Sequence, residues 1–91
     1  SSIEVEDTLY AHPAVAACGV VGKLSEKWGE TPVAFVELKP GKTATQDEMI
    51  KFLRGHLAGY KCPKEIVFGE VPKTSTGKIQ KFKLREIARA G

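Results

Sequence analysis

The sequence has few of the residues that build metal sites and hydrolase triads. Its 91 residues include two histidines and two cysteines, and neither cysteine belongs to a Cys-x-x-Cys pair. Cys18 lies in an apolar run, which favours a role as a small, buried hydrophobic residue. The patterns Gly-x-Ser-x-Gly and His-Glu-x-x-His are both absent. The sequence therefore predicts no metal bound by this chain and no self-contained hydrolase site.

Long hydrophobic runs are absent as well. No apolar stretch approaches the roughly 20 residues that span a membrane. The first ten residues contain three acids and no lysine or arginine, unlike the start of a secretory signal peptide. The chain opens inside an expected helix, so we expect a piece of a longer protein whose targeting signals lie elsewhere. Together with the low number of cysteines, this predicts a cytoplasmic location or the matrix of an organelle.

Positive charge is scarce in the first two thirds of the chain and concentrated in the last third. Residues 1–60 contain six basic and eight acidic residues, whereas residues 61–91 contain eight basic and three acidic ones. The net charge of the whole chain is +3. Such a basic region indicates an anionic partner, for example a nucleotide, a phosphorylated cofactor or nucleic acid. A solvated surface without a ligand has the same composition, so both interpretations stay open.

Hydrophobic periodicity and turn residues divide the chain into six elements. Ser1 with Glu4, and Thr45 with Glu48, have the pattern of a helix capping box. Nearly continuous apolar runs indicate buried strands, and Gly59 is a candidate for the end of the second helix. The expected helices cover residues 1–11, 45–57 and 81–90, and the expected strands cover residues 14–21, 31–39 and 65–71. This order predicts one α+β domain over residues 1–91, with helices covering a small three-stranded sheet.

A polar loop that presents one lysine follows the last expected strand. Residues 72–81 read Pro-Lys-Thr-Ser-Thr-Gly-Lys-Ile-Gln-Lys, in which Gly77 precedes Lys78. A nucleotide P-loop requires glycine at Pro72 and serine or threonine at Ile79, so that interpretation fails. A cation on such a loop can stabilise charge that develops on a phosphate, although a solvated basic loop looks the same. One lysine is an incomplete site, so we expect another domain to complete it.

Four segments of the chain form a pattern when they are taken together. They are the Ser-Ser-Ile-Glu-Val-Glu opening with His12-Pro13, the sequences Lys-Trp-Gly-Glu and Pro-Val-Ala-Phe-Val at 27–30 and 32–36, Tyr-Lys-Cys-Pro-Lys at 60–64, and the loop from Pro72 to Ile79. In this order they resemble the C-terminal domain of the adenylate-forming enzymes, which include the acyl-CoA synthetases. The resemblance covers nearly the whole chain. The opening is most similar to fatty-acyl-CoA synthetases and their relatives.

The resemblance implies the mobile, lid-like C-terminal domain of a two-domain enzyme, an AMP-forming acid–thiol ligase. Such an enzyme first joins a carboxylic acid, expected here to be a fatty acid, to ATP as an acyl-adenylate. It then transfers the acyl group to CoA. ATP and Mg²⁺ would bind to an N-terminal domain that is not within these 91 residues. We therefore expect the isolated chain to be inactive.

The family pattern also implies roles for five residues. Lys78 would bridge the substrate carboxylate and the phosphate oxygens during adenylation, and Gly77 would let the backbone come close to the substrate. Trp28, Tyr60 and Lys64 would contact CoA, because an aromatic ring can stack on adenine and a lysine can meet a phosphate. For Trp28, a ring that simply covers the hairpin is an equally open interpretation.

The main alternative is a stand-alone basic module that binds nucleic acid or a partner protein. Surfaces that bind nucleic acid usually place exposed aromatic residues among basic ones. In the basic third of this chain the aromatic residues are Phe68 and Phe82. We expect both in the core, with Phe82 on the same apolar helix stripe as Leu84, Ile87 and Ala88. This expectation argues against nucleic acid as the partner.

Overall fold

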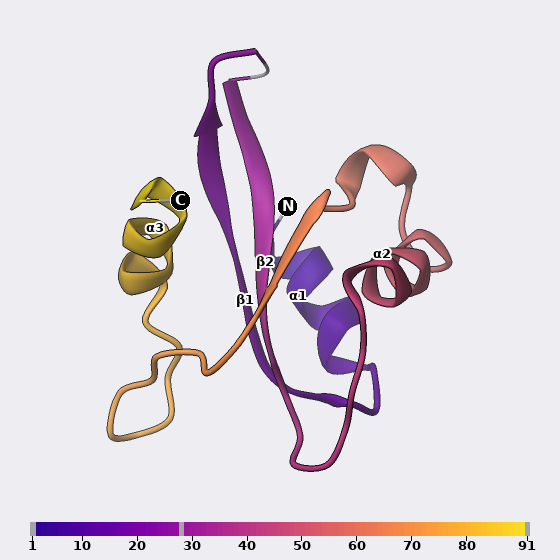
Figure 1. The fold of residues 1–91 in the computed structure, drawn as a ribbon, viewed down its shortest axis with the longest axis vertical. Coiled ribbons are helices and arrows are strands. Elements are labelled where there is room, and N and C mark those ends of the chain that lie inside the picture. Colours follow the sequence, from indigo (N-terminus) through magenta and orange to yellow (C-terminus); the bar gives the residue numbers. More distant parts are fainter. Residues whose placement is uncertain (1, 28, 91) are drawn as a thin grey trace.

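A three-stranded sheet with helices on both of its faces forms the fold (Figure 1). The computed structural model describes residues 2–27 and 29–90. In chain order the elements are α1 (Ser2–Tyr10), β1 (Val15–Ser25), β2 (Gly29–Leu38), α2 (Gln46–Arg54), the short 3₁₀ helix η1 (Gly59–Lys61), β3 (Glu65–Phe68) and α3 (Lys81–Ala90). The predicted α+β class and order of elements are confirmed. Within the described residues, no helix is long and apolar enough to cross a membrane.

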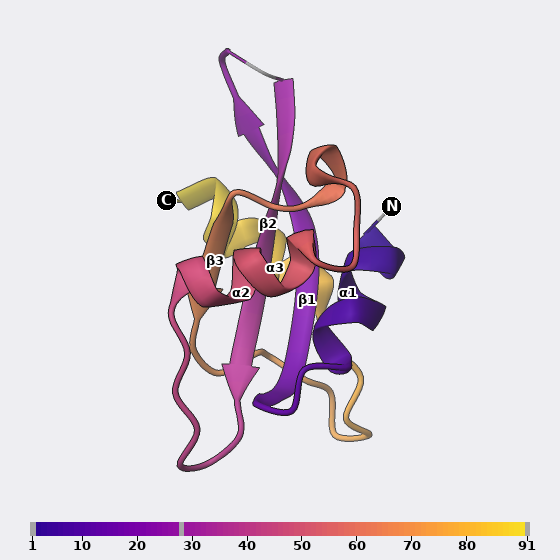
Figure 2. The ribbon, with the colours of Figure 1, turned by 90° about the vertical axis from the view of Figure 1, so that its right-hand side faces the viewer.

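The central strand of the sheet is β2, because the strand order is β1-β2-β3. β1 and β2 are antiparallel, whereas β2 and β3 are parallel. Helices α1 and α2 lie on one face of the sheet and α3 lies on the other (Figures 1 and 2). Since both faces are covered there, side chains that point either way from residues 17–21 of β1 and 33–36 of β2 are buried. This explains why these parts of the two strands are continuous apolar runs.

The core is divided by the sheet into two clusters of buried side chains. The cluster under α1 and α2 contains Val5, Leu9, Val15, Cys18, Val20, Ala34, Val36, Met49, Leu53, Cys62 and Ile66. The cluster under α3 contains Ala17, Val21, Val33, Phe35, Val71, Leu84 and Ala88. Neighbouring residues of β2 thus belong to different clusters, as the alternation of side chains along a strand requires.

The β1–β2 hairpin is longer than predicted. β1 continues to Ser25, which pairs with Gly29 at the start of β2. Residues 23–25 were expected to belong to a connection because they are polar or lie beside polar residues. Hydrogen bonding to the partner strand, rather than hydrophobicity, keeps them in the sheet.

β3 is shorter than predicted and leaves its last side chain partly exposed. It ends at Phe68 rather than at Val71. Phe68 is 36% exposed, so the prediction that it lies in the core was wrong. β3 is an edge strand, and a side chain there has a neighbouring strand on one side only.

The N-terminus of α2 confirms the predicted capping box. The Glu48 amide donates a hydrogen bond to Thr45 Oγ1 at 3.1 Å, and the Thr45 amide donates one to Glu48 Oε1 at 2.9 Å. Each side chain therefore satisfies a backbone donor that the helix itself leaves unpaired. The other predicted capping box depends on Ser1, which lies outside the described residues.

The C-terminus of α2 lies earlier than predicted. The helix ends at Arg54 and is capped by Gly55, whereas Gly59, the predicted capping residue, begins η1. After Gly55 the chain turns, and the partly buried Leu57 packs against the core cluster under α1 and α2. Leu57 therefore reaches the core from beyond the end of the helix.

α3 contacts the sheet through a narrow seam. Leu84 and Ala88, one helical turn apart, are 1% and 6% exposed, whereas Phe82 and Ile87 are 54% and 50% exposed. The prediction that Phe82 and Ile87 are core residues was therefore wrong. The seam is narrow because α3 approaches the sheet closely at a glycine: a Cβ atom on Gly19 would lie 2.6 Å from Leu84 Cδ1.

Side chains of α1 cover the outer edge of β1. The Tyr10 hydroxyl accepts a hydrogen bond from the Cys18 amide at 3.2 Å and donates one to the Cys18 carbonyl at 3.3 Å. Glu6 Oε2 accepts a hydrogen bond from the Val20 amide at 2.8 Å. These contacts close an edge that another strand could otherwise pair with.

Cys18 is buried, and its predicted role as a small hydrophobic residue is confirmed. Burial, together with a smaller effect of the Glu6 charge, raises the pKa of the Cys18 thiol to about 12.

Candidate functional site

The loop that carries Lys78 is closed on itself by backbone hydrogen bonds. Lys73 and Ile79 form an antiparallel bridge. The Gln80 amide donates to the Pro72 carbonyl at 2.9 Å, and the Thr74 amide donates to the Lys78 carbonyl at 2.8 Å. The loop is thus a small hairpin with a defined stem, rather than an open connection between β3 and α3.

The tip of this hairpin depends on Gly77. Its backbone has a φ of +88°, a left-handed conformation that glycine adopts without strain. No heavy atom would lie within 4 Å of a Cβ placed on Gly77, so the conformation, not crowding within the domain, requires glycine. Thr74 Oγ1 accepts a hydrogen bond from the Lys78 amide at 3.1 Å and lies 3.0 Å from Thr76 Oγ1. Both hydroxyl groups therefore help to form the turn.

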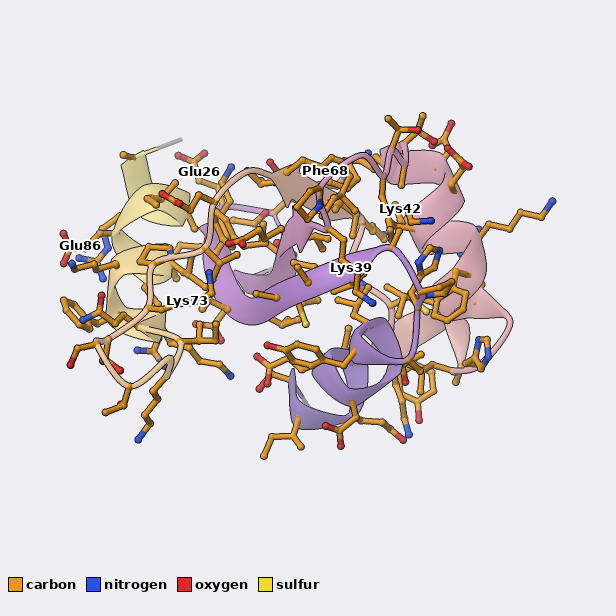
Figure 3. All side chains as sticks on the ribbon, turned by 90° about the horizontal axis from the view of Figure 1, so that it is seen from below. Glu26, Lys39, Lys42, Phe68, Lys73 and Glu86 are labelled. Atoms are coloured by element: carbon orange, nitrogen blue, oxygen red, sulfur yellow. The ribbon has the colours of Figure 1, made fainter. Side chains whose placement is uncertain are left out.

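The charge of Lys78 is available, in contrast to the charges at the two ends of the loop. Lys73 Nζ lies 2.7 Å from Glu37 Oε1, and Lys81 Nζ lies 2.6 Å from Glu6 Oε2. Lys78 is exposed, and within residues 2–27 and 29–90 its ammonium group makes no hydrogen bond or ion pair. Figure 3 shows Lys73 beside the loop. Lys78 is thus the lysine of the loop that can meet an external anion.

Glu37 stabilises the base of the loop through its ionised form. Its Oε1 accepts hydrogen bonds from Lys73 Nζ at 2.7 Å and from the Val71 amide at 2.9 Å. The hydrogen bond from Lys73, followed by that from Val71, holds the pKa of the Glu37 carboxyl below its ordinary value. The contact is therefore strongest when Glu37 is charged.

This lowered pKa predicts a pH-dependent contribution to folding. The contribution of Glu37 should be complete above the ordinary glutamate pKa of about 4.3 and should disappear as the pH falls through its lower folded pKa. We expect Glu37→Gln to destabilise the chain at pH 6 and to cost progressively less towards pH 3, as measured by urea unfolding at several pH values. A cost that is the same at pH 6 and pH 3 would show that the charge of Glu37 does not matter.

The residues proposed for CoA lie at the opposite end of the domain from the Lys78 loop. η1 carries Tyr60, which is 86% exposed, and Lys64 is exposed shortly before β3. In Figures 1 and 2, η1 and the tip of the β1–β2 hairpin lie towards one end of the long axis, and the loop at 72–80 lies at the other. The segment that carries Tyr60 and Lys64 therefore lies away from the loop that carries Lys78. Trp28 lies outside the described residues.

A groove of about 580 Å³ runs beside η1. It is lined by residues of α1, β1, β2, η1 and α3, among them Ser2, Glu30, Tyr60, Lys61, Lys81 and Arg85. Lys61 Nζ lies 3.1 Å from Glu4 Oε1, and the hydrogen bond that the ammonium group donates to this carboxylate raises the pKa of Lys61. Acidic and basic groups are thus mixed in this groove.

The sequence analysis missed the acidic partners of the loop lysines. Glu6 belongs to the first helix, and its side chain points to β1 and α3. Glu37 lies on a strand far from Lys73 in the sequence. The one available signal was that Glu37 lies in an apolar strand, where a charge needs a partner.

Comparisons with known proteins agree with this arrangement. The model of the family described as AMP-binding enzyme C-terminal domain matches residues 4–78. A 2-methylpropanoate–CoA ligase of Humulus lupulus is 52% identical over 92 residues, which cover 98% of this chain and 16% of that protein. The present chain therefore spans less than a fifth of the length of this curated relative.

Solved structures share the same fold. An acyl-CoA synthetase of Brucella canis superposes with a TM-score of 0.87 at 37% identity, over 96% of this chain and 17% of that one. An anthranilate CoA ligase in complex with anthranoyl-AMP has a TM-score of 0.87 at 41% identity, over 99% of this chain and 18% of that one. The family match, the relative and both structures agree, and the chain belongs to the AMP-binding enzyme C-terminal domain family.

Proposed function

We propose that this chain is the mobile C-terminal domain of an ATP-dependent acyl-CoA synthetase, which supplies Lys78 for acyl-adenylate formation and part of the CoA site. The observation that carries the proposal is the separation of two candidate surfaces. An unpaired lysine lies on a well-defined hairpin at one end of the domain, and the exposed Tyr60 and Lys64 lie towards the other. Its partner would be the N-terminal domain of the same protein, with ATP and a carboxylic acid bound there.

In the first step, a carboxylate oxygen of the acid attacks the α-phosphorus of ATP, and pyrophosphate leaves. Both reactants are anions, so their approach is opposed by repulsion. An ammonium group held between them lowers this cost, because opposite charges a few Å apart attract strongly where water is excluded. Lys78 is suited to this role, since no acidic group among the described residues competes for its charge.

We assign Mg²⁺ no ligand in this domain. Among residues 2–27 and 29–90, no three histidine, cysteine, aspartate or glutamate side chains lie together in a way that could hold a metal ion. As the family resemblance implies, we expect Mg²⁺ to bind with the nucleotide in the N-terminal domain. What this chain contributes to the phosphate charge is the ammonium group of Lys78.

In the second step, the CoA thiolate attacks the carbonyl carbon of the acyl-adenylate, and AMP leaves. One domain can serve both steps if it turns between them and presents first the Lys78 loop and then the surface around Tyr60. The exposed ring of Tyr60 offers a face for adenine, and Lys64 offers a cation for a phosphate. Trp28, which lies outside the described residues, would add a second aromatic ring.

The similar ligases indicate the general class of the acyl substrate. The names of the similar ligases contain 2-methylpropanoate and anthranilate, which supports a carboxylic acid substrate in general. We predict that the substrate is a fatty acid, that the acceptor is CoA rather than a carrier thiol, and that the protein lies in the cytoplasm or the matrix of an organelle.

The stand-alone nucleic-acid module is the weaker alternative. Phe82 is exposed beside Lys83 after all, but the family membership favours the ligase.

The CoA surface can be tested in the full-length enzyme. We expect Tyr60→Ala and Lys64→Ala each to raise the apparent KM for CoA roughly 5- to 30-fold, because each removes a contact of about 1–2 kcal/mol. ATP–pyrophosphate exchange should stay nearly unchanged, since the surface is distant from the Lys78 loop. Phe82→Ala and Lys51→Ala are matched controls, as they remove an exposed aromatic ring and an exposed lysine elsewhere. An unchanged KM for CoA in both test variants would refute the assignment.

A further inference from the structure

The loop that carries Lys78 is attached to the core at both of its ends by ion pairs. Lys73, in the first strand of the hairpin, pairs with Glu37 of β2. Lys81, directly after the hairpin and at the start of α3, pairs with Glu6 of α1. The two acids come from different elements, and the catalytic proposal assigns neither of them a role.

The first ion pair fixes the strand that enters the loop. Glu37 Oε1 receives both the Lys73 ammonium at 2.7 Å and the Val71 amide at 2.9 Å, and Lys73 Nζ also donates to the Val71 carbonyl at 3.0 Å. β3 has already ended at Phe68. The Glu37 carboxylate therefore attaches Val71 and Lys73 to β2, beyond the point where the pairing of β2 with β3 ends.

The second ion pair joins three elements at one carboxylate. Glu6 Oε2 accepts the Val20 amide at 2.8 Å and the Lys81 ammonium at 2.6 Å, so α1, β1 and α3 meet at this group. The Glu6 side chain is only 14% exposed. If one partner of such a shielded pair moves away, the other charge is left without compensation. Departure from the paired geometry therefore costs more free energy than it does for an exposed ion pair.

Between these two attachments, backbone hydrogen bonds close residues 72–80 into a hairpin. The backbone of Lys78 is thereby fixed relative to β2 on one side and to α1 and β1 on the other. We propose that the pairs Glu37–Lys73 and Glu6–Lys81 position Lys78 for acyl-adenylate formation, an inference that rests on the proposed function. They act through the loop, without contact to the substrate.

The physical reason lies in the preorganisation that an electrostatic catalyst needs. A charged donor stabilises a transition state only if it is already near the developing charge, and a displacement of about 1 Å can cost up to about 10²-fold in rate. Lys78 has a long, flexible side chain, so its reach is set by where its backbone lies. The pairs also occupy both acids that face the loop lysines, which leaves the ammonium of Lys78 for the substrate.

The test uses the full-length enzyme and separates its two half-reactions. We expect Lys73→Met and Lys81→Met to slow ATP–pyrophosphate exchange roughly 10- to 100-fold, with little change in the KM for ATP or the acid. Acyl-CoA formation from preformed acyl-adenylate and CoA should stay within about twofold of wild type. Lys73→Arg and Lys81→Arg should restore most of the exchange, because arginine can still pair with the carboxylates. Lys51→Met is the matched control for loss of one exposed lysine.

A purely structural role would give a different result. Destabilisation lowers the amount of folded enzyme, so both half-reactions would fall together, and that outcome would overturn the positioning role. Glu37→Gln and Glu6→Gln keep the shape of the side chain and an acceptor oxygen for the backbone amide, so they repeat the test from the acidic side of each pair. Exchange at the wild-type rate in these variants and in the methionine variants would likewise overturn the inference.

Lys78→Ala, measured in parallel, separates this inference from the proposed function. If Lys78→Ala abolishes exchange and the pair variants do not impair it, the positioning role fails and the proposed function stands. If Lys78→Ala leaves exchange intact, the proposed function fails, and the inference fails with it.

Discussion

Replacement of Lys78 by alanine in the full-length enzyme is expected to slow acyl-adenylate formation on the order of 10²-fold or more. This is the scale on which loss of one preorganised donor affects catalysis. The ammonium group is exposed and makes no ion pair among the described residues, so the variant should fold as the wild type does. ATP–pyrophosphate exchange with a carboxylic acid measures the effect directly.

Arginine should not replace Lys78. The guanidinium group keeps the positive charge but spreads it over a planar, rigid fork, whereas the lysine ammonium is a compact charge on a flexible stem. Between a carboxylate and a phosphate, the larger group would not fit the same position. The Lys78→Arg variant should therefore remain close to Lys78→Ala in the exchange assay.

The second half-reaction provides the internal control for Lys78. Acyl-CoA formation from preformed acyl-adenylate should survive in Lys78→Ala, because the domain then presents its other end. Lys42→Ala is a matched control, since Lys42 is an exposed lysine in the connection between β2 and α2 (Figure 3). If both half-reactions decline together while the protein stays folded, Lys78 has no role specific to adenylation and the domain rotation does not apply to this enzyme.

Leu84→Ala is expected to lower the free energy of unfolding of this chain by about 2–5 kcal/mol, the usual cost of a cavity at a fully buried leucine. Leu84 is 1% exposed and packs against Gly19 of β1. Since small domains are stable by only about 5–15 kcal/mol, the variant should unfold at a much lower urea concentration. Urea unfolding followed by far-ultraviolet circular dichroism measures the change.

Ile87 lies on the same helix and provides the control for Leu84. Its side chain is 50% exposed, so Ile87→Ala should change the free energy of unfolding by less than about 1 kcal/mol. The sequence alone placed both residues on one apolar stripe. Equal destabilisation by the two substitutions would contradict the narrow seam through which α3 contacts the sheet.

Features that depend on neighbours along the chain could be predicted from the sequence. The Thr45–Glu48 capping box, the apolar run that becomes β1, and the order of helices and strands all follow from local patterns. The loop with Gly77 and Lys78 was identified for the same reason. Turn geometry and the choice between helix and strand are set within a few residues, so they can be read from the sequence.

The tertiary structure alone decided which charges and apolar groups meet across the fold. Phe82 and Leu84 belong to the same helix, yet only Leu84 faces the space that Gly19 leaves open. Glu6 and Glu37 became partners of Lys81 and Lys73 because α1 and β2 lie beside the two ends of one loop. Burial and ion pairing depend on the surface that lies opposite each side chain. In this chain that surface comes from segments distant in sequence, and no local pattern specifies it.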